Sequence, residues 1–378
     1  MNMYDEFGPE KILEVYDAKT EMRGFVVIDN TKLGPGKGGI RMRPSVTKEE
    51  VFRLARTMTW KCSLAGLPFG GAKSGIIANP KKLQKEQISE QGSDDAQKQV
   101  SDKKAIVEAF SKALKPVSPK LYVAAPDMNM AEEEMEWFAN ANGDMKSCTG
   151  KPKSMGGIPH ELGSTGFGVY HSTLIALKHM NVKVGGVSFA VEGFGNVGWF
   201  VAKYLTKAGA KLVAASDSKG LIYNKEGLDF EELAKVKKEQ KTVTKYEDGE
   251  VMDSNKILDI QADVLITAAI PDLVKDEDVP RLKFKLIVQG SNIAMSYEAE
   301  KQFHDKGILV VPDFVANAGG VISSYIEYIE GTPEDMFKMV EERITKNTKL
   351  VLDEARDKQI MPRKAAMDIA MQRVRKQN

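Results

Sequence analysis

The chain has very few cysteines and no long apolar segment. Cys62 and Cys148 are the only cysteines among 378 residues, which excludes a fold held by several disulfides and favours a reducing cytoplasm. No run of 18 apolar residues occurs, and the N-terminus lacks the apolar region of a signal peptide. Four scattered histidines show no metal-ligand spacing. We therefore expect a cytoplasmic protein with no membrane span and no metal site.

The chain also lacks an excess of charge of either sign. It carries 54 Lys and Arg against 53 Asp and Glu, which leaves a net charge of +1. This balance argues against a strongly basic nucleic-acid binder and against an acidic disordered chain. The hydrophobic fraction of 42% is ordinary for a globular protein, and the length suggests two or three domains.

The second half of the sequence alternates short apolar runs with amphipathic segments. Apolar runs at 187–191, 211–216 and 263–267 each precede a helical pattern, and only helical patterns follow residue 313, with a long amphipathic stretch at 333–357. Strands that alternate with helices are typical of a parallel sheet with crossover helices. The sequence therefore predicts an α/β fold for this part.

A glycine motif lies between the first of these strands and the next helix. Residues 187–198 read VSFAVEGFGNVG, so Gly193, Gly195 and Gly198 match the pattern G-x-G-x-x-G. The first glycine permits a tight turn, the second lets a pyrophosphate approach the backbone at a helix N-terminus, and the third allows close helix packing. We expect a dinucleotide to bind along the whole loop, which consists of Gly193, Phe194, Gly195, Asn196, Val197 and Gly198.

An acidic residue follows the next strand, where the adenosine ribose of a dinucleotide is usually bound. Asp217 comes about 20 residues after Gly198, and a carboxylate in that place usually binds a ribose hydroxyl and repels a 2′-phosphate. The adjacent Ser218 and Lys219 could instead receive that phosphate. The sequence therefore predicts NAD or NADP as cofactor and leaves the choice open.

Three lysines occupy unusual places in the first half. Lys37 and Lys73 stand inside glycine-rich stretches at 34–44 and 68–75, which we interpret as loops. Lys61 falls on a helix predicted over 47–66, within roughly 20° of the apolar stripe that contains Leu54. Solvated loop lysines and a lysine extended along a stripe edge are the ordinary alternatives. Together the three lysines suggest a cationic cleft for a small carboxylate.

Several collinear motifs carry a family resemblance. They are LGPGKGGIRM at 33–42, MTWKCSLAGLPFGGAKSGI at 58–76, AAPDMNM at 124–130, STGFG at 164–168, GFGNVG at 193–198 and VPDFVANAGGVISSYIE at 311–327. In this order they resemble the glutamate/leucine/phenylalanine/valine dehydrogenases, from about residue 24 to residue 330. The resemblance implies an NAD(P)-dependent amino acid dehydrogenase.

The resemblance also implies a domain organisation. An N-terminal α/β substrate and oligomerisation domain would span 1–163, with C-terminal helices of about 330–378 folding back onto it. A Rossmann-type, doubly wound dinucleotide domain would span 164–329, with the active site in the cleft between the two. The family forms homo-oligomers, often hexamers, so the resemblance implies the same assembly here.

Individual roles follow from the same resemblance. Lys73 corresponds to the catalytic lysine and Asp127 to its partner acid, which exchanges a proton with the substrate amine. Lys61 corresponds to the lysine that pairs with the α-carboxylate. Asn317 lies in the motif that lines the substrate and nicotinamide, and we count Asn292 with it as cofactor-binding. Thr165 lies in the motif near the nicotinamide amide, and we count it among the substrate-binding residues.

Two positions indicate the substrate. Glutamate enzymes of the family carry a lysine where Lys37 stands and a serine where Ser324 stands, whereas leucine-type enzymes carry apolar residues. An aliphatic substrate would leave a desolvated Lys37 unpaired, at a cost of roughly 3–5 kcal/mol. We therefore expect reversible deamination of glutamate to 2-oxoglutarate and ammonium. The alternatives are a dehydrogenase of another amino acid, a hydroxyacid dehydrogenase, and a non-catalytic regulator that binds nucleotides or amino acids.

Three features depart from the family pattern. Ser74 stands where a glycine usually follows the catalytic lysine. The segment 289–296 keeps Asn292 but lacks the small and proline residues that usually follow it. A polar stretch at 81–104 is longer than usual, and we interpret it as a solvated excursion.

Overall fold

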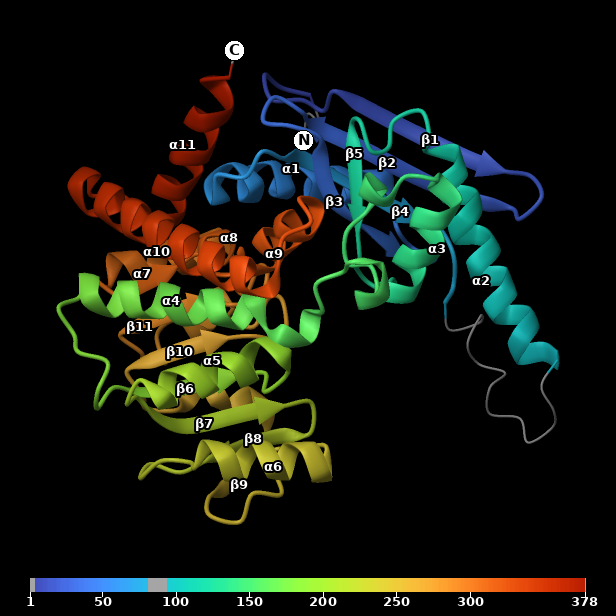
Figure 1. The fold of residues 1–378 in the computed structure, drawn as a ribbon. Helices are drawn as coiled ribbons and strands as arrows, with labels where there is room; N and C mark the ends of the chain where they lie inside the picture. The colour runs from blue at the N-terminus through green and yellow to red at the C-terminus, as the bar shows by residue number, and fades with distance from the viewer. Residues whose placement is uncertain (1–3, 81–93, 378) are drawn as a thin grey trace. The chain divides into compact units, whose positions relative to one another are not determined.

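The computed structural model describes residues 4–80 and 94–377, which form two compact units (Figure 1). The first unit contains Met1–His160, Ser323–Pro333 and Ala370–Asn378, and the second contains Glu161–Ile322 and Glu334–Ile369. The sequence groups 330–378 with the N-terminal domain, whereas the structure places residues 334–369 of that range in the second unit. Residues 81–93 of the predicted polar excursion lie outside the described residues.

The first unit contains a five-stranded mixed sheet. Its strands, in the order β1-β2-β4-β3-β5, are β1 (Lys11–Asp17), β2 (Met22–Asn30), β4 (Gly70–Ile76), β3 (Gly36–Met42) and β5 (Tyr122–Ala125). β3 runs parallel to both β4 and β5, while β2 is antiparallel to β1 and β4. The three parallel strands therefore lie side by side, and their carboxyl ends meet at one edge of the sheet.

Helices cover both faces of this sheet. α1 (Lys48–Ala65) packs on one face, where Val27 of β2 meets Val51 and Ala55. α2 (Asp94–Ala113) and α3 (Glu132–Asn142) pack on the other, where Phe110 and Phe138 join a core with Ile40. Short 3-10 turns follow at Met145–Ser147, Lys153–Met155 and His160–Leu162. The predicted helix over 47–66 is confirmed, including the cap at Thr47, whose side chain accepts a hydrogen bond from the Glu50 backbone N–H at 3.2 Å.

The structure corrects the interpretation of the two glycine-rich stretches as loops. Residues 36–42 and 70–76 are the strands β3 and β4, not loops. A Cβ atom on Gly38 would lie 1.7 Å from the backbone oxygen of Ala72, and one on Gly71 would lie 2.1 Å from the Thr59 hydroxyl of α1. Glycine is therefore required here for close packing of strand on strand and of helix on sheet rather than for turning the chain.

The second unit contains a seven-stranded sheet. Its order is β12-β11-β10-β6-β7-β8-β9, with β12 (Leu309–Val311), β11 (Leu286–Gln289), β10 (Val264–Thr267), β6 (Ser188–Glu192), β7 (Lys211–Asp217), β8 (Gly220–Tyr223) and β9 (Glu250–Met252). The first five in this order are parallel, and β8 and β9 add an antiparallel edge. The glycine loop follows β6, which lies between β10 and β7 and is therefore at a topological switch point.

The helices of this unit complete a doubly wound fold. They are α4 (Ser164–His179), α5 (Asn196–Lys207), α6 (Phe230–Gln240), α7 (Tyr297–Asp305), α8 (Asp313–Ala316) and α10 (Pro333–Lys358). Short 3-10 turns occur at Ser254–Asp259 and Asp276–Asp278, and α9 (Gly319–Tyr328) and α11 (Pro362–Arg375) each cross the boundary between units. The predicted α/β class and the Rossmann-type sheet are confirmed. Among residues 4–80 and 94–377, no helix is both long and apolar enough to cross a membrane.

Candidate functional site

The register of the first sheet puts several predicted site residues on its α1 face. Lys37 pairs with Gly71 of β4 and with Val123 of β5, and Gly39 pairs with Ala125. Paired residues of neighbouring strands point to the same face, and so do alternate residues along one strand. Lys37 and Gly39 on β3 therefore share a face with Lys73 on β4.

Lys73 and Asp127 meet across strand β3. The Lys73 ammonium nitrogen lies 3.2 Å from the Asp127 carboxylate. Burial lowers the pKa of Lys73, although the Asp127 carboxylate opposes this shift. Burial would raise the pKa of Asp127, but the Lys73 and Arg41 cations outweigh it and hold that pKa below its ordinary value. The pair therefore combines a lysine that loses its proton easily with a carboxylate that stays charged.

Arg41 holds this carboxylate in place, and sequence reasoning missed it. Its Nε donates to the Asp127 carboxylate at 2.8 Å, and its Nη1 donates to the Glu50 carboxylate at 2.6 Å. Glu50 belongs to the first turn of α1, so the bridge ties the helix to the end of β5. The sequence did contain a signal for this role. Alternate side chains of a strand point to the same face, and Arg41 lies two residues after Gly39.

Gly39 provides the space in which the pair meets. A Cβ atom at this position would lie 2.8 Å from the Asp127 Cβ and 3.2 Å from the Lys73 Nζ. It would also lie 2.7 Å from the Pro126 backbone oxygen, which cannot move aside as a flexible side chain would. Any larger residue would therefore crowd the contact between Lys73 and Asp127.

Lys37 is completely buried in the first unit. Its ammonium group donates to the Ala124 backbone oxygen at 2.6 Å and to the Thr149 hydroxyl at 2.7 Å. Burial lowers the pKa of Lys37 to about 7, and the nearby Glu327 carboxylate opposes that shift. The interpretation of Lys37 as a solvated loop lysine is therefore wrong, because the side chain is buried. A buried amine of this kind favours an anionic partner.

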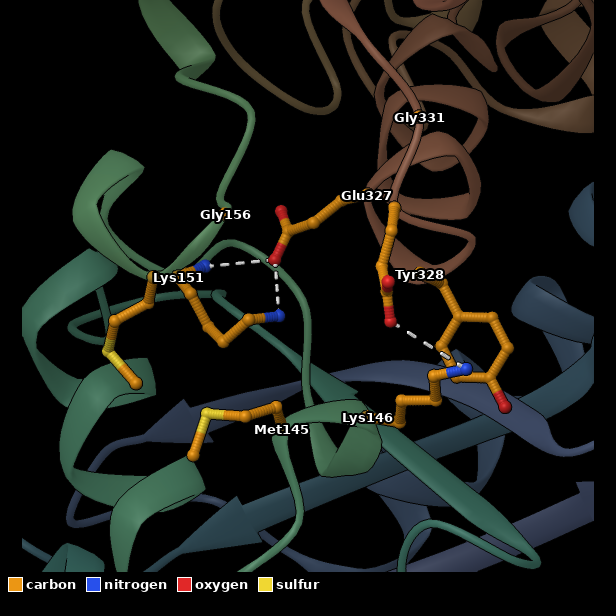
Figure 2. A pocket seen from close by; sticks show the side chains of 9 residues that line it. Met145, Lys146, Lys151, Gly156, Glu327, Tyr328 and Gly331 are labelled. Atoms are coloured by element: carbon orange, nitrogen blue, oxygen red, sulfur yellow. Dashed lines mark hydrogen bonds and ion pairs between the residues drawn. The ribbon is translucent and has the colours of Figure 1, made fainter.

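Glu327 is a second buried charge beside Lys37 that sequence reasoning missed. Its carboxylate accepts from the Lys151 ammonium at 2.7 Å and from the backbone N–H groups of Gly150, Lys151 and Ile158 at 2.9, 3.3 and 3.3 Å. Figure 2 shows the bonds between Glu327 and Lys151, with the Lys146 ammonium beside the Tyr328 ring. Glu327 lies one helical turn after Ser324, and this spacing was the available signal.

A cavity of about 460 Å³ opens beside this buried pair. It is lined by Met145, Lys146, Lys151, Met155, Gly156, Glu327, Tyr328, Glu330 and Gly331. Lys151 and Glu327 neutralise one another at its wall, and Lys146 lies 3.9 Å from the Glu330 carboxylate. The wall of the cavity therefore carries no excess of either charge.

Lys61 and Ser324 are less enclosed than the other predicted residues of this unit. Lys61 is half-buried on α1, one residue before the fully buried Cys62, and Ser324 is half-buried on α9. Cys62 and Cys148 are both free and buried, and burial raises the pKa of each thiol to about 12. Neither thiol is therefore a reactive nucleophile at neutral pH.

In the second unit, the glycine loop has the backbone shape that a pyrophosphate needs. Gly193 has a φ of +90°, and a Cβ on Gly198 would lie 2.1 Å from the Gly193 oxygen. Gly195 is the N-cap of α5 without a side-chain cap, and a Cβ there would meet open space. Phe194 is buried, while Asn196 and Val197 form the first turn of α5. The open helix N-terminus fits a dinucleotide phosphate.

Asp217, at the end of β7, is heavily engaged within the protein. One carboxylate oxygen accepts from the Lys237 ammonium at 2.6 Å and from the Val243 N–H at 2.8 Å. The other accepts from the Lys219 N–H at 2.8 Å and from the Thr242 hydroxyl at 3.3 Å. Burial would raise the pKa of Asp217, but these donors, led by Lys237, hold it below its ordinary value.

Asn317 follows α8, which comes after β12, the edge strand of the seven-stranded sheet opposite β9. Its side-chain amide donates to the Gly290 oxygen at 3.2 Å and to the Asn292 side-chain oxygen at 2.9 Å, whereas its own side-chain oxygen is buried and has no hydrogen-bond partner among the described residues. The Thr165 hydroxyl lies 3.0 Å from the place of a Cβ on Gly320. The structure thus brings Asn292 and Asn317 together, and the orphaned oxygen fits a donor such as a carboxamide. Thr165 lies in the first turn of α4, whose N-cap is Gly163.

Arg363 of α11 fixes the segment around Asn292. It donates to both carboxylate oxygens of Glu300 at 2.7 Å and to Asp313 at 3.0 Å, while Asp313 accepts from the Ile293 N–H at 2.8 Å. Within the described residues, no group of three or more His, Cys, Asp or Glu side chains is arranged to hold a metal ion.

Comparisons with known proteins agree with this arrangement. The family model described as "Glu/Leu/Phe/Val dehydrogenase, dimerisation domain" matches residues 9–143, and "Glutamate/Leucine/Phenylalanine/Valine dehydrogenase" matches residues 156–378. The chain is 39% identical over 362 residues to a glutamate dehydrogenase of Aeropyrum pernix, covering 91% of this chain and 83% of the relative. It is 34% identical over 359 residues to an NADP-specific glutamate dehydrogenase of Saccharolobus shibatae, with coverages of 89% and 81%.

A solved structure shares the same fold across nearly the whole chain. The glutamate dehydrogenase of Peptoniphilus asaccharolyticus superposes with a TM-score of 0.81 at 26% identity, covering 98% of this chain and 91% of that one. Because the two family models together span most of the sequence, the chain belongs to the glutamate/leucine/phenylalanine/valine dehydrogenase family.

Proposed function

We propose that this chain catalyses the reversible, NAD(P)-dependent oxidative deamination of L-glutamate to 2-oxoglutarate and ammonia. The observation that carries the proposal is the buried amine of Lys37 on the sheet face that also holds the Lys73–Asp127 pair. Relatives named glutamate dehydrogenase at 34–39% identity support the same substrate. The chain is an amino acid dehydrogenase of this family, and the identity of its amino acid is what the proposal adds.

The substrate's two carboxylates would be bound by separate cations. Lys37 would exchange its bonds to Ala124 and Thr149 for the γ-carboxylate, with Ser324 donating a further hydrogen bond. Lys61 would pair with the α-carboxylate. Lys37 and Gly39 are two residues apart on one strand, so Lys37 lies on the same sheet face as the contact between Lys73 and Asp127. An aliphatic side chain would leave Lys37 without an anionic partner.

Lys73 and Asp127 would handle the protons of the reaction. The neutral Lys73 amine accepts a proton from the water that adds to the imine carbon, and it returns a proton as ammonia leaves. Asp127 accepts a proton from the substrate ammonium group before the α-carbon is oxidised. Arg41 orients the Asp127 carboxylate for this exchange and lowers its pKa, so Asp127 gives the proton up again and returns to its charged form.

NAD or NADP would accept the hydride from the α-carbon as a bound cofactor. The backbone of residues 193–198 would hold its pyrophosphate, because the N-terminus of α5 is open there. Asp217 and Ser218 would lie at its adenosine ribose, and Asn292, Asn317 and Thr165 at its nicotinamide end. The orphaned Asn317 oxygen would accept a hydrogen bond from the carboxamide.

The proposal extends to the organisation of the protein. We assign substrate binding and oligomer contacts to the N-terminal unit and dinucleotide binding to the second unit, and we propose a homo-oligomer, specifically a hexamer. A family model named for dimerisation matches residues 9–143 and supports the assembly, which light scattering on the purified protein would test. Two reduced, buried cysteines support a location in the cytoplasm.

The function is tested by following the oxidation of NADH and NADPH with ammonium and one of two oxoacids. We expect kcat/KM for 2-oxoglutarate to exceed that for 4-methyl-2-oxopentanoate by at least 100-fold, since the second oxoacid leaves Lys37 unpaired. A preference for 4-methyl-2-oxopentanoate would contradict the proposed substrate, although the chain would still be an amino acid dehydrogenase. No turnover with either oxoacid would favour a non-catalytic binding protein and contradict the proposal.

A further inference from the structure

The acidic residue that usually binds the adenosine ribose has no acceptor capacity left in this chain. Each carboxylate oxygen accepts about two hydrogen bonds, and both oxygens of Asp217 already have two donors. Its side chain is only 6% exposed. A ribose diol would have to displace a charge-assisted bond from Lys237 or a backbone N–H in order to reach it. Asp217 is therefore poorly suited to the ribose contact that favours NAD.

The same contacts change the charge around the ribose position. Lys237 lies 2.6 Å from the Asp217 carboxylate and neutralises it, yet its own side chain remains 26% exposed. Lys219 and Ser218 are exposed in the turn that follows β7, and the Lys219 N–H is bonded to Asp217. Asp217, Lys219 and Lys237 together carry a net charge of +1, because they are one aspartate and two lysines. An additional anion is therefore attracted here rather than repelled.

We propose that this chain selects NADP(H) and that Lys237, Lys219 and Ser218 bind the 2′-phosphate of its adenosine ribose. This inference rests on the proposed function, because it specifies which of the two dinucleotides the proposed reaction uses. Asp217 is a positioning residue, because it holds the Lys237 ammonium and the Ser218–Lys219 turn at the phosphate. A 2′-phosphate brings up to two negative charges and three acceptor oxygens, which match two ammonium groups and one hydroxyl.

Binding without turnover tests the proposal most cleanly. Titration calorimetry on the full-length protein with 2′,5′-ADP and with 5′-AMP isolates the contribution of the 2′-phosphate. We expect 2′,5′-ADP to bind 10- to 100-fold more tightly, about the gain from one or two charge-assisted hydrogen bonds. NADP+ should exceed NAD+ by a similar factor. Equal binding of the two mononucleotides, or tighter binding of NAD+, would overturn the proposal.

Two lysine variants and a matched control locate the contact. Lys237→Gln and Lys219→Gln should each weaken 2′,5′-ADP about 3- to 30-fold while changing 5′-AMP less than twofold. Lys235→Gln is the control, because Lys235 is exposed on α6 about 200° around the helix from Lys237 and should have no effect. Unchanged 2′,5′-ADP binding in both lysine variants would overturn the assignment of the phosphate to this turn.

Asp217→Asn separates the positioning role from direct ribose binding. The amide keeps one acceptor but loses the charge-assisted bond that holds Lys237, so 2′,5′-ADP should bind a few-fold more weakly while NAD+ binding changes less than about twofold. A ribose-binding acid would instead lose NAD+ affinity by tenfold or more, and that result would overturn the proposal. Circular dichroism on this variant, together with its 5′-AMP affinity, shows whether the turn is still folded.

The outcome of this test is distinct from the outcome for the proposed reaction. If NADH and NADPH support the amination of 2-oxoglutarate with equal kcat/KM, the reaction stands and the NADP(H) selection is overturned. If 2′,5′-ADP binds with the expected preference but no oxoacid is aminated, the selection stands and the proposed reaction is contradicted.

Discussion

The two glycine-rich regions of this molecule resemble one another in sequence and differ in what their glycines do. In β3 and β4, glycines lie within strands and leave room beside a buried sheet face for the side chains of Lys37 and Lys73. After β6, glycines expose the backbone of a helix N-terminus to a ligand. Glycine content alone therefore does not show whether the glycines make room for a side chain or expose the backbone to a ligand. The lysines next to the glycines distinguish the two cases.

The two regions also differ in how their charges are balanced. In the first region Lys37 is buried, with a carbonyl and a hydroxyl as its hydrogen-bond partners among the described residues, and burial lowers the pKa of that amine to about 7. The second region surrounds Asp217 with donors and keeps it charged. A buried charge with too few partners lowers the stability of the fold, and binding an anion relieves that cost. A charge that is fully hydrogen-bonded neither lowers stability in this way nor favours a further ligand.

The largest effect should come from the Lys73–Asp127 pair. We expect Lys73→Ala and Asp127→Asn each to lower kcat for glutamate by about 10²–10⁴-fold, the usual contribution of a positioned acid or base. Binding of the dinucleotide should change less than twofold, because the glycine loop is unaltered. Lys112→Ala is the control, since that lysine is exposed on α2. Near-normal turnover in either site variant would show that the first region performs no proton transfer.

A smaller effect should follow removal of the buried charge. Lys37→Met should lower kcat/KM for 2-oxoglutarate by about 100-fold, the loss expected when a desolvated carboxylate loses its partner. The preference over 4-methyl-2-oxopentanoate should narrow or invert, and kcat should change less than KM. A variant that keeps the wild-type preference would remove Lys37 from substrate recognition.

Gly39→Ala should reduce turnover without removing any functional group. The added methyl would lie 2.8 Å from the Asp127 Cβ and 2.7 Å from a backbone oxygen, so the pair must separate. We expect kcat to fall about 10- to 100-fold, since small displacements of catalytic groups carry costs of that size. Gly185→Ala meets open space and serves as the control. Equal activity of both variants would show that β3 tolerates a side chain at position 39.

The smallest effect should be on stability. Because the pKa of Lys37 is about 7 in the folded chain and 10.5 when unfolded, the unfolded state binds more protons between these values and stability rises with pH across that window. Lys37→Met removes this penalty but leaves two buried acceptors unpaired, for a net gain on the order of 2 kcal/mol below pH 7. The advantage should disappear as pH rises towards 10.5, as followed by thermal unfolding. A variant that is less stable than wild type at pH 6 would show that Lys37 stabilises the fold.

Much of the second region was predictable from local sequence, and less of the first was. The strand–glycine–helix pattern at 187–208 has one ordinary outcome, so the strand, the loop and the helix after it were predicted in this order. The strand that carries Lys37 was interpreted as a loop, because its glycines hide the apolar alternation. Because that strand was not predicted, the face that Gly39 and Arg41 share could not be predicted either. The role of Arg41 also depends on contacts with residues far from it in the sequence.

The most direct test of the account is the pH dependence of kcat for glutamate oxidation at saturating substrate and cofactor. The neutral amine of Lys73 is the form that accepts a proton, and burial lowers its pKa below the ordinary 10.5. We therefore predict that kcat rises with pH and reaches its plateau through a midpoint well below 10.5. A kcat that is independent of pH between 6 and 10, or one that rises only near 10.5, would contradict the claim that a buried lysine on this sheet carries the proton transfer.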